Sequence, residues 1–393
     1  MGLILYLIGN FSGSNTGAGG HYYSLIEMSS QVKKVRSAHV VSLGQAVPVA
    51  LSGLDDYTHI SCSLINQYRG VRRIINLVSE NGWAVTAIHA YDSNVAYIGM
   101  VLAKKLSAPL FLTKCGGPVP KYFFPNAPYL FVFHPADFDY FSSRRRGVVT
   151  LLPNRVSRPT YDSERAIKVF GEKRPGVLTF FRIGRIGKTY KETVLSAIRL
   201  VKCFNDNGIE SELKVIGHLE SKAVLEELKS AADGSVTFHT DFIETYKASE
   251  LIGYCDVVVG TGRGVLEAMA SGRIVFFPVL GSDYPCLLNK KTFEFGFAEN
   301  FSQRVSLSAD VQSVTSPDIF LPYFHSESLR EALRSTSLEL FGQYFDSVKG
   351  AVRLIEIYDD GARDAGKLSY WDMFVQRAYL FALGLINLFR KSI

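Results

Sequence analysis

The sequence predicts an α/β protein made of two doubly wound domains. Its 393 residues exceed the usual size of a single hydrophobic core, so two domains are the expected arrangement. Short apolar runs alternate with stretches long enough for amphipathic helices, which is typical of a mostly parallel sheet covered by helices. A polar segment from Ser157 to Arg174 interrupts this alternation, which then starts again.

Composition and charge narrow the classes of function. Hydrophobic residues make up 47% of the chain and charged residues 20%, as in ordinary globular proteins. The net charge of +6 fits an anionic substrate or an acidic membrane surface, whereas a nucleic-acid-binding protein usually carries a denser basic stripe. The cysteines stand singly without C-x-x-C spacing, which argues against a disulfide framework or a zinc site and favours a reducing compartment.

The first domain is predicted to cover residues 1–165. Its opening apolar run is short and lacks a basic leader, so it predicts a buried strand and not a signal peptide. A helix is expected after the first glycine-rich loop, and another from Asn94 to Leu106. The strands expected in this domain are Leu3–Ile8, Ala38–Leu43, Ala84–His89, Pro109–Thr113, Tyr129–Phe133 and Leu151–Val156.

The second domain is predicted to cover residues 166–360, followed by a helical tail over 361–393. Its expected helices are Glu192–Asn205 and Lys222–Ala231. Two such units imply a cleft between them, and open sheets of this kind bind ligands beyond the carboxyl ends of their strands. The strands expected here are Val177–Arg182, Leu213–Gly217, Val236–His239, Asp256–Gly260 and Ile274–Pro278.

A glycine-rich loop, Gly9–Gly20, lies between the first strand and a helix. Glycines there let backbone N–H groups approach an anion, and the N-terminus of the next helix adds a favourable field. The same pattern fits a flexible surface turn, so both interpretations stay open. A dinucleotide site is disfavoured, because no acidic residue ends the second strand, Val40–Gly44.

A second glycine-rich loop, within Val257–Gly272, joins a strand to a helix that contains Glu267. Loop amides can hold phosphate or sugar oxygens, and a carboxylate in the first turns of the helix can accept hydrogen bonds from two ribose hydroxyls. A solvated glutamate near a helix start is the plain alternative. The position at the end of a hydrophobic strand favours a binding role.

A third loop, Phe181–Lys191, also joins a predicted strand to a helix. Arg185, together with Lys188 or Lys191, would place cations beside an anionic group, as diphosphate binding requires. Alone, such a loop is most often an exposed basic turn. Its place in the same half of the chain as Glu267 gives it weight.

Several segments follow one another in an order that covers most of the chain. In chain order they are Gly19-Gly20, Ile88–Asn94, Leu152–Val156, Gly184-Arg185 with Lys191, Val215–Gly217 and Leu266–Arg273. In this order they resemble the family 4 retaining glycosyltransferases. The resemblance implies a GT-B fold, in which two Rossmann-like domains face each other across the active site.

The resemblance also implies roles for single residues. Arg185 and Lys191 would hold the donor diphosphate, where the leaving charge develops, with Lys188 as a further candidate. Glu267 matches the glutamate that bonds the ribose hydroxyls. The other residues implied in contact with the donor phosphate or sugar are Gly19, Gly20, Gly264, Val265 and Leu266.

Two positions depart from the family pattern. The family has a first glutamate eight residues before the second, and Val259 stands there in this sequence. The sugar contacts would then pass to Thr261, Gly262 or Arg263.

The second departure concerns the family's His-x-His, which here reads His89-Ala-Tyr91. The task of the missing imidazole would shift to His89, Tyr91 or Asp92. The catalytic candidates are therefore His89, Arg185 and Lys191. Retaining transfer in this family needs no protein nucleophile, because the departing diphosphate can take the acceptor's proton on the same face. Neither a cofactor nor a metal is implied.

Some features are weaker signals. Asp137-Phe-Asp139 is a D-x-D sequence, but its aromatic neighbours and the lack of other hard-metal ligands argue against a metal site. The basic run Ser142–Gly147 fits a solvated loop or a contact with acidic lipid headgroups. The apolar tail Tyr370–Lys391 fits a helix that packs back on the first domain, or an interfacial helix at a membrane.

The resemblance implies a metal-independent hexosyltransferase that moves a sugar from a nucleotide diphosphate-sugar to a glycan or lipid-linked acceptor. Its expected setting is surface polysaccharide or glycoconjugate synthesis in the cytoplasm, with a possible peripheral contact at the cytoplasmic face of the membrane. No nucleic-acid partner is expected. A non-catalytic nucleotide-sugar-binding subunit, a nucleotide-sugar epimerase of the same fold and a dehydrogenase are the alternatives.

Overall fold

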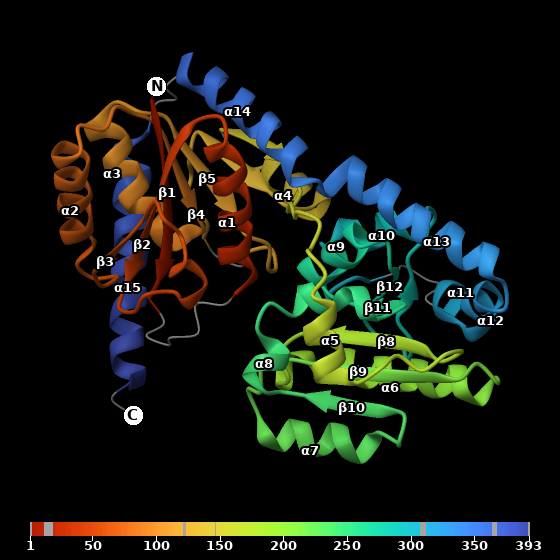
Figure 1. Cartoon of the computed structure of the whole chain (residues 1–393). Helices are drawn as coiled ribbons and strands as arrows, with labels where there is room; N and C mark the ends of the chain where they lie inside the picture. Colours follow the sequence, from red (N-terminus) through yellow and green to blue (C-terminus); the bar gives the residue numbers. More distant parts are fainter. Residues whose placement is uncertain are drawn as a thin grey trace. The chain divides into compact units, whose positions relative to one another are not determined.

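The computed structural model describes residues 2–11, 19–120, 123–145, 147–306, 312–363 and 368–391 (Figure 1). The chain forms two compact units. Unit 1 consists of Met1–Arg155 and Ser347–Ile393, and unit 2 of Val156–Asp346. The chain enters and leaves unit 2 at neighbouring points, because Val156 and Asp346 form an isolated β-bridge.

The units begin and end at other residues than the sequence predicts. The predicted boundary at 165 falls inside unit 2, because α5 (Ser163–Phe170) packs against η4 (Ala248–Tyr254) and Arg165 pairs with Glu250 at 3.2 Å. The return to unit 1 begins with α14 (Ser347–Arg363), which packs on α1 (Gly20–Lys33), and not at residue 361. The expected return of the C-terminal helices to the first domain is confirmed.

Unit 1 contains a seven-stranded parallel sheet in the order β3-β2-β1-β4-β5-β6-β7. The strand order reverses between β1 and β4, which makes the carboxyl ends of these two strands the topological switch point. The strands are β1 (Leu3–Asn10), β2 (Ser37–Gly44), β3 (Tyr57–Ser61), β4 (Val85–Tyr91), β5 (Leu110–Lys114), β6 (Tyr129–Val132) and β7 (Val148–Leu151).

Helices cover both faces of this sheet, as the buried apolar strands require. One face packs against α1 and α14, and the other against α2 and α3, with α15 lying on α3 (Figure 1). The further helices of unit 1 are α1 (Gly20–Lys33), η1 (Val49–Leu51), α2 (Gln67–Glu80), η2 (Ser93–Val95), α3 (Ala96–Leu106), α4 (Pro135–Ser142) and α15 (Tyr370–Lys391).

Unit 2 contains a six-stranded sheet in the order β10-β9-β8-β11-β12-β13, in which β13 runs antiparallel to β12. Here the switch point lies between β8 and β11, which pair directly. The strands are β8 (Leu178–Ile183), β9 (Ser211–Ile216), β10 (Val236–His239), β11 (Val257–Val259), β12 (Ile274–Phe277) and β13 (Cys286–Leu287). The further helices are η3 (Lys188–Tyr190), α6 (Lys191–Asp206), α7 (Lys222–Ala231), α8 (Phe242–Thr245), α9 (Arg263–Ala270), α10 (Phe293–Ala298), α11 (Gln312–Thr315), α12 (Pro317–Phe320), η5 (Leu321–Phe324), α13 (Glu327–Leu340) and η6 (Phe341–Phe345).

Two doubly wound sheets were expected and both are present. The last strand of unit 1 was placed too late in the sequence, since β7 ends at Leu151, where the expected strand began. Pro153 lacks an amide hydrogen and so cannot donate to a strand ladder there. Among the helices of the described ranges, none combines the length and the apolar character needed to cross a membrane.

Candidate functional site

The candidate donor site of unit 2 is formed by the loops that follow β8 and β11. Val257 of β11 lies beside Phe180 of β8, so both loops leave the sheet at its switch point. The helices that follow, α6 and α9, begin there, and their N-terminal amides point toward the same edge of the sheet. Ligands of doubly wound sheets bind in this position.

The loop after β11 is held in an unusual backbone conformation. Gly262 has a φ of 51°, which favours glycine, and its amide donates a hydrogen bond of 3.0 Å to the Phe301 carbonyl. Asn300 and Phe301 also have positive φ values, 53° and 50°. The turn that supports Gly262 is therefore itself strained, and such strain is common at functional sites.

Glu267 lies one turn into α9 and is mostly buried. Its Oε1 accepts a hydrogen bond of 2.8 Å from Nε of Arg263, so the carboxylate is oriented from within its own helix. The amides of Gly264 and Val265 donate to the carbonyls of Thr261 and Gly262 inside the turn. The side chain of Leu266 lies in the core.

The loop after β8 gathers the basic side chains of the candidate site. Arg185 is exposed, pairs with Glu220 at 2.9 Å and donates a hydrogen bond of 3.0 Å to the Tyr190 hydroxyl. Lys191 pairs with Glu227 on α7, and Lys188 is exposed in η3. A bound diphosphate would have to replace these carboxylates as the partner of the cations.

Arg182 is a residue of this region that the sequence analysis missed. It lies at the end of β8, is 1% exposed and donates a hydrogen bond of 2.8 Å to the Thr193 hydroxyl. A Cβ on Gly184 would lie 2.7 Å from Nη1 of Arg182, so the guanidinium would have to shift to make room for a side chain. The sequence signal for it was a charged residue, Arg182, within the mostly apolar strand β8.

In unit 1 the switch point carries the first glycine-rich loop. Residues 12–18 of this loop lie outside the described residues. Gly19 precedes α1 with extended backbone, and a Cβ on Gly20 would meet open space. The first turn of α1 contains no acidic residue, so its N-terminus keeps the positive end of the helix dipole.

His89 and Tyr91 are core residues of unit 1. His89 is fully buried, with Nδ1 2.5 Å from the Tyr358 hydroxyl and Nε2 2.6 Å from the Thr113 hydroxyl. Burial lowers the pKa of His89 to about 3. Tyr91 is also buried and packs its ring on His89 and Tyr6. Both ring nitrogens of His89 are occupied by protein hydroxyls, which argues against the catalytic role expected for it.

Asp92 is the residue of this segment that reaches the switch point. Its φ of 72° is unusual for a residue with a side chain, and its carboxylate accepts a hydrogen bond of 2.7 Å from the Ser93 amide. His21 lies in the first turn of α1 near Asp92. Burial lowers the pKa of the His21 imidazole, and the Asp92 charge partly opposes this effect.

The D-x-D sequence does not form a metal site in this structure. Asp137 is buried and lies 2.8 Å from Nζ of Lys114 and 3.0 Å from Nε2 of His134, while Asp139 is exposed. In the described part of the chain, no group of three potential metal ligands gathers. In the basic run, Arg145 is largely buried and donates to the Pro125 carbonyl, so this residue supports the unit structurally.

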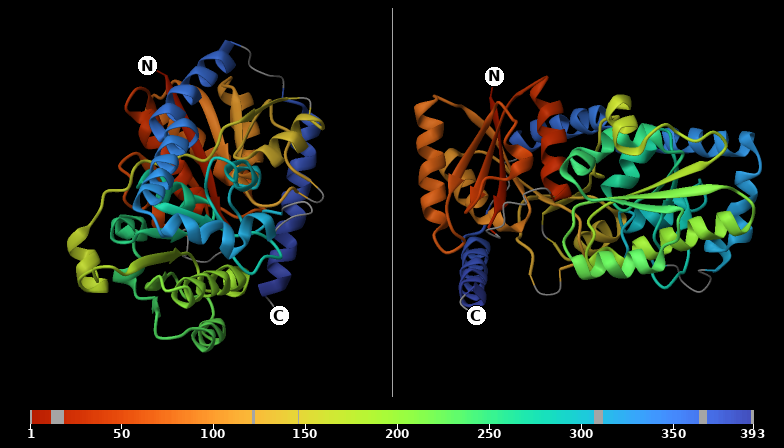
Figure 2. Two further views of the ribbon diagram at one scale, coloured as in Figure 1. Left: turned by 90° about the vertical axis from the view of Figure 1, so that its right-hand side faces the viewer. Right: turned by 60° about the horizontal axis from the view of Figure 1, so that its bottom comes forward.

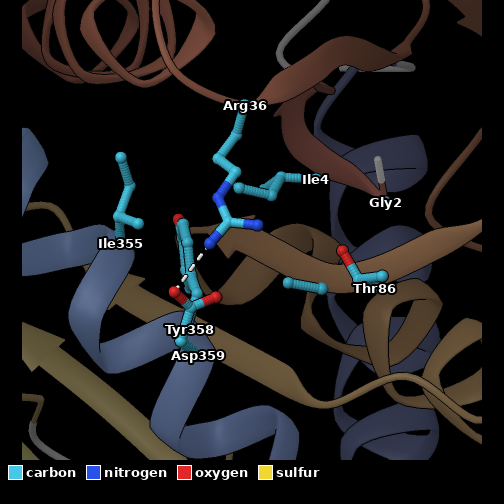
Figure 3. Close-up of a pocket in the computed structure, with 8 residues that line it drawn as sticks. Gly2, Ile4, Arg36, Thr86, Ile355, Tyr358 and Asp359 are labelled. Carbon is cyan, nitrogen blue, oxygen red and sulfur yellow. Dashed lines mark hydrogen bonds and ion pairs between the residues drawn. The ribbon is translucent and has the colours of Figure 1, made fainter.

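A small crevice of unit 1 lies at the opposite end of the strands from the switch point (Figure 3). It is lined by the starts of β1 and β4 and by α14, and an ion pair of 2.7 Å between Arg36 and Asp359 crosses it (Figure 3). Its volume of about 30 Å³ is far below the roughly 300–1,000 Å³ of a small-molecule site. It therefore carries no candidate site for a nucleotide.

Comparison with known proteins identifies the fold. No protein-family model and no curated protein matches the sequence. HepE of Anabaena, solved with UDP and glucose, is 14% identical with a TM-score of 0.62, over 92% of this chain and 100% of that one. Sucrose-phosphate synthase of Thermosynechococcus elongatus is 12% identical with a TM-score of 0.59, over 92% and 99% of the two chains. The chain has the GT-B fold.

The GT-B fold is shared by enzymes with other chemistry. The UDP-GlcNAc 2-epimerase of Neisseria meningitidis, solved with UDP-GlcNAc, is 11% identical with a TM-score of 0.53, over 90% of this chain and 99% of that one. At these identities the similarity establishes the fold, and the activity has to be argued from the residues of the site.

Proposed function

We propose that this protein is a retaining glycosyltransferase of family 4 that uses a nucleotide diphosphate-sugar as donor. The proposal rests on one observation: the two loops at the switch point of unit 2 combine a basic segment around Arg185 with the oriented carboxylate of Glu267. A nucleoside diphosphate has the complementary groups, an anionic diphosphate and a ribose with two neighbouring hydroxyls. The acceptor would be a glycan or a lipid-linked glycan, as in surface polysaccharide or glycoconjugate synthesis.

Each residue would act by binding or by charge. Glu267 would accept the hydrogen bonds of the ribose hydroxyls. Arg185, Lys191 and Lys188 would stabilise the charge that develops on the leaving diphosphate, which is the main requirement of such a transfer when the diphosphate itself takes the acceptor proton. This mechanism needs no metal ion. Thr261 and its neighbours in the glycine loop would contact the sugar.

Two alternatives have support of different kinds. An epimerase of the same fold is favoured by the structural neighbour with that activity, but it would need acid and base groups near the sugar. A binding-only subunit is favoured by Val259, which stands where a glutamate is expected. Product analysis with a bound donor distinguishes them, since an epimerase changes the sugar without an acceptor and a binding-only subunit changes nothing.

The variant Glu267→Gln should bind UDP-glucose at least about tenfold more weakly than the wild type, because the amide accepts hydrogen bonds less strongly than a carboxylate. Titration calorimetry with UDP-, GDP- and ADP-sugars measures this directly. The matched control is Glu226→Gln on the exposed face of α7, which should leave the affinity unchanged. A wild type that binds none of these donors would contradict the proposed function.

The exposed face of α15 gives the proposed enzyme a way to reach a lipid-linked acceptor. Gln376 and Leu380 are buried against unit 1, while Trp371, Phe374 and Phe381 are 68%, 62% and 47% exposed. The C-terminal turns of α15 extend past the other elements of unit 1 (Figures 1 and 2). We propose that this face lies in the headgroup region of an anionic membrane, where aromatic and basic residues are favoured.

Basic residues accompany the apolar face of α15. Arg377 is exposed on the same helix, and Lys104 of α3 lies 3.0 Å above the Tyr370 ring. The wild type should therefore sediment with phosphatidylglycerol vesicles and much less with phosphatidylcholine vesicles. Replacing Trp371, Phe374 and Phe381 by serine should reduce binding at least about tenfold.

The control for this experiment is Phe242→Ser, which removes an exposed aromatic ring from unit 2. It should leave vesicle binding unchanged. Analytical ultracentrifugation tests the other occupant of the α15 face, a second copy of the chain. A wild type that dimerises through this face and does not sediment with the vesicles would contradict the membrane proposal.

A further inference from the structure

Near the end of strand β8 lies a buried arginine, Arg182, whose charge is balanced by no carboxylate among the described residues. The described partners of Arg182 are neutral, the carbonyl of Ile183 and the hydroxyl of Thr193, and its Nε has no hydrogen-bond partner. Burial lowers the pKa of Arg182 to about 10, and the neighbour that partly opposes this effect is the Tyr190 phenol. Burying a cation without a counter-ion is strongly unfavourable, so this position favours the approach of an anion.

The surroundings of Arg182 add positive potential instead of reducing it. Thr193, its hydrogen-bond partner, lies in the first turn of α6, where the helix dipole has its positive end. The guanidinium of Arg182 lies against the backbone of Gly184, since a Cβ on this glycine would be 2.7 Å from Nη1. An anion that approaches the loop after β8 therefore meets a buried charge and a helix N-terminus together.

Arg182 is also connected to the exposed cation of the loop. Its Nη2 donates to the Thr193 hydroxyl, which in turn donates a hydrogen bond of 2.7 Å to the Tyr190 carbonyl. The Tyr190 hydroxyl accepts a hydrogen bond of 3.0 Å from Arg185, whose guanidinium lies 4.9 Å above the tyrosine ring. Arg182 thus helps to position Tyr190 through Thr193, and Tyr190 in turn contacts Arg185.

Arg185 and Lys191 differ from Arg182 in one respect. Both are paired with glutamates at the surface, Glu220 and Glu227, and these carboxylates can move into water when a ligand replaces them. Arg182 has no such partner to exchange in the part of the chain that the structure describes. Its gain on binding an anion is therefore larger, since no existing ion pair has to be broken.

We propose that Arg182 is a positioning residue of the donor site, whose buried charge is neutralised by the donor diphosphate and whose hydrogen bonds hold Tyr190 and Arg185 in place. The proposal deepens the proposed function and rests on it. The ligand class follows from the chemistry: a compact anion with several oxygens, such as a diphosphate, is the group that a buried guanidinium and a helix N-terminus bind best.

The test compares Arg182→Met and Arg182→Lys with the wild type. Calorimetry with inorganic pyrophosphate, UDP and uridine gives the affinities, and thermal unfolding without ligand gives the stability. Arg182→Met should bind pyrophosphate and UDP at least about tenfold more weakly, whereas uridine binding should stay the same. Its Tm without ligand should equal or exceed that of the wild type, because an unbalanced buried charge has been removed.

Arg182→Lys should recover part of the pyrophosphate affinity, since it restores the charge without the forked geometry. The control Lys202→Met removes a positive charge from the exposed surface of α6. It should leave the affinities for pyrophosphate and UDP, and the Tm, unchanged. A methionine variant that loses stability but keeps its pyrophosphate affinity would assign Arg182 a structural role alone, and an equal loss for uridine and pyrophosphate would also overturn the proposal. A wild type that binds neither UDP nor pyrophosphate overturns the proposed function as well.

Discussion

Replacing Asp137 by alanine should destabilise unit 1 by about 3–5 kcal/mol, the usual effect of removing one partner of a buried ion pair. Lys114 is 4% exposed and would keep a buried ammonium group without its carboxylate. Burial alone would raise the pKa of Asp137, but the hydrogen bond from His134 and the charges of His134 and Lys114 together lower it. Urea unfolding at neutral pH measures the change in the free energy of unfolding.

Asp139 provides the matched control for Asp137, because it belongs to the same D-x-D sequence and is exposed. Its replacement by alanine should change the free energy of unfolding by less than about 0.5 kcal/mol. If Asp137 held a metal ion, Mg²⁺ or Mn²⁺ would stabilise the wild type but not the Asp137→Ala variant. That result would contradict the structural role, as would equally small effects of the two substitutions.

The buried His89 should make the protein sensitive to acid. Its pKa is about 3 in the folded chain, whereas an unperturbed histidine has a pKa of about 6.5. The unfolded chain therefore binds the proton more readily, so the stability is complete above pH 6.5 and is lost as the pH falls from about 6.5 toward 3. At pH 5 this one group should already lower the free energy of unfolding by about 2 kcal/mol.

The variant His89→Gln tests this assignment, because glutamine can still form a hydrogen bond with Thr113 but does not titrate. Denaturant unfolding at several pH values should show a dependence between pH 7 and pH 5 that is weaker by about 2 kcal/mol. Tyr358→Phe is the control: it removes the hydroxyl that His89 contacts but keeps the imidazole, so it should lower the stability at every pH and keep the slope. Parallel curves for His89→Gln and the wild type would rule out His89 as the source.

The central strands could be predicted from the sequence because both faces of a parallel sheet are covered. Residues Leu3–Ile8 are buried almost throughout, so the strand appears in the sequence as a continuous apolar run. β3 could not be recognised in the same way. Its sequence Tyr57–Ser61 is mostly polar, since an edge strand is only partly covered, and its pairing with β2 depends on residues distant in the chain.

The candidate site was predictable where the backbone itself limits the choice of residue. The loop after β11 could be found because the positive φ of Gly262 requires glycine and the helix with Glu267 follows at once. His89 was expected to be catalytic because it stands at the first position of the His-x-His of the resembled family. Its partner Tyr358 follows 269 residues later, and no local pattern reveals that this tyrosine closes the core above the imidazole.

The bridge between Val156 and Asp346 also affects how readily unit 2 can be exchanged in evolution or by design. Unit 2 is an insertion whose entry and exit lie side by side within a polypeptide that otherwise forms unit 1. Segments joined to a host in this manner can be exchanged for a related segment without stretching the host's connections. Donor preference, which the proposed function places in the inserted part, can therefore be altered while the helices and sheet of the surrounding part stay the same.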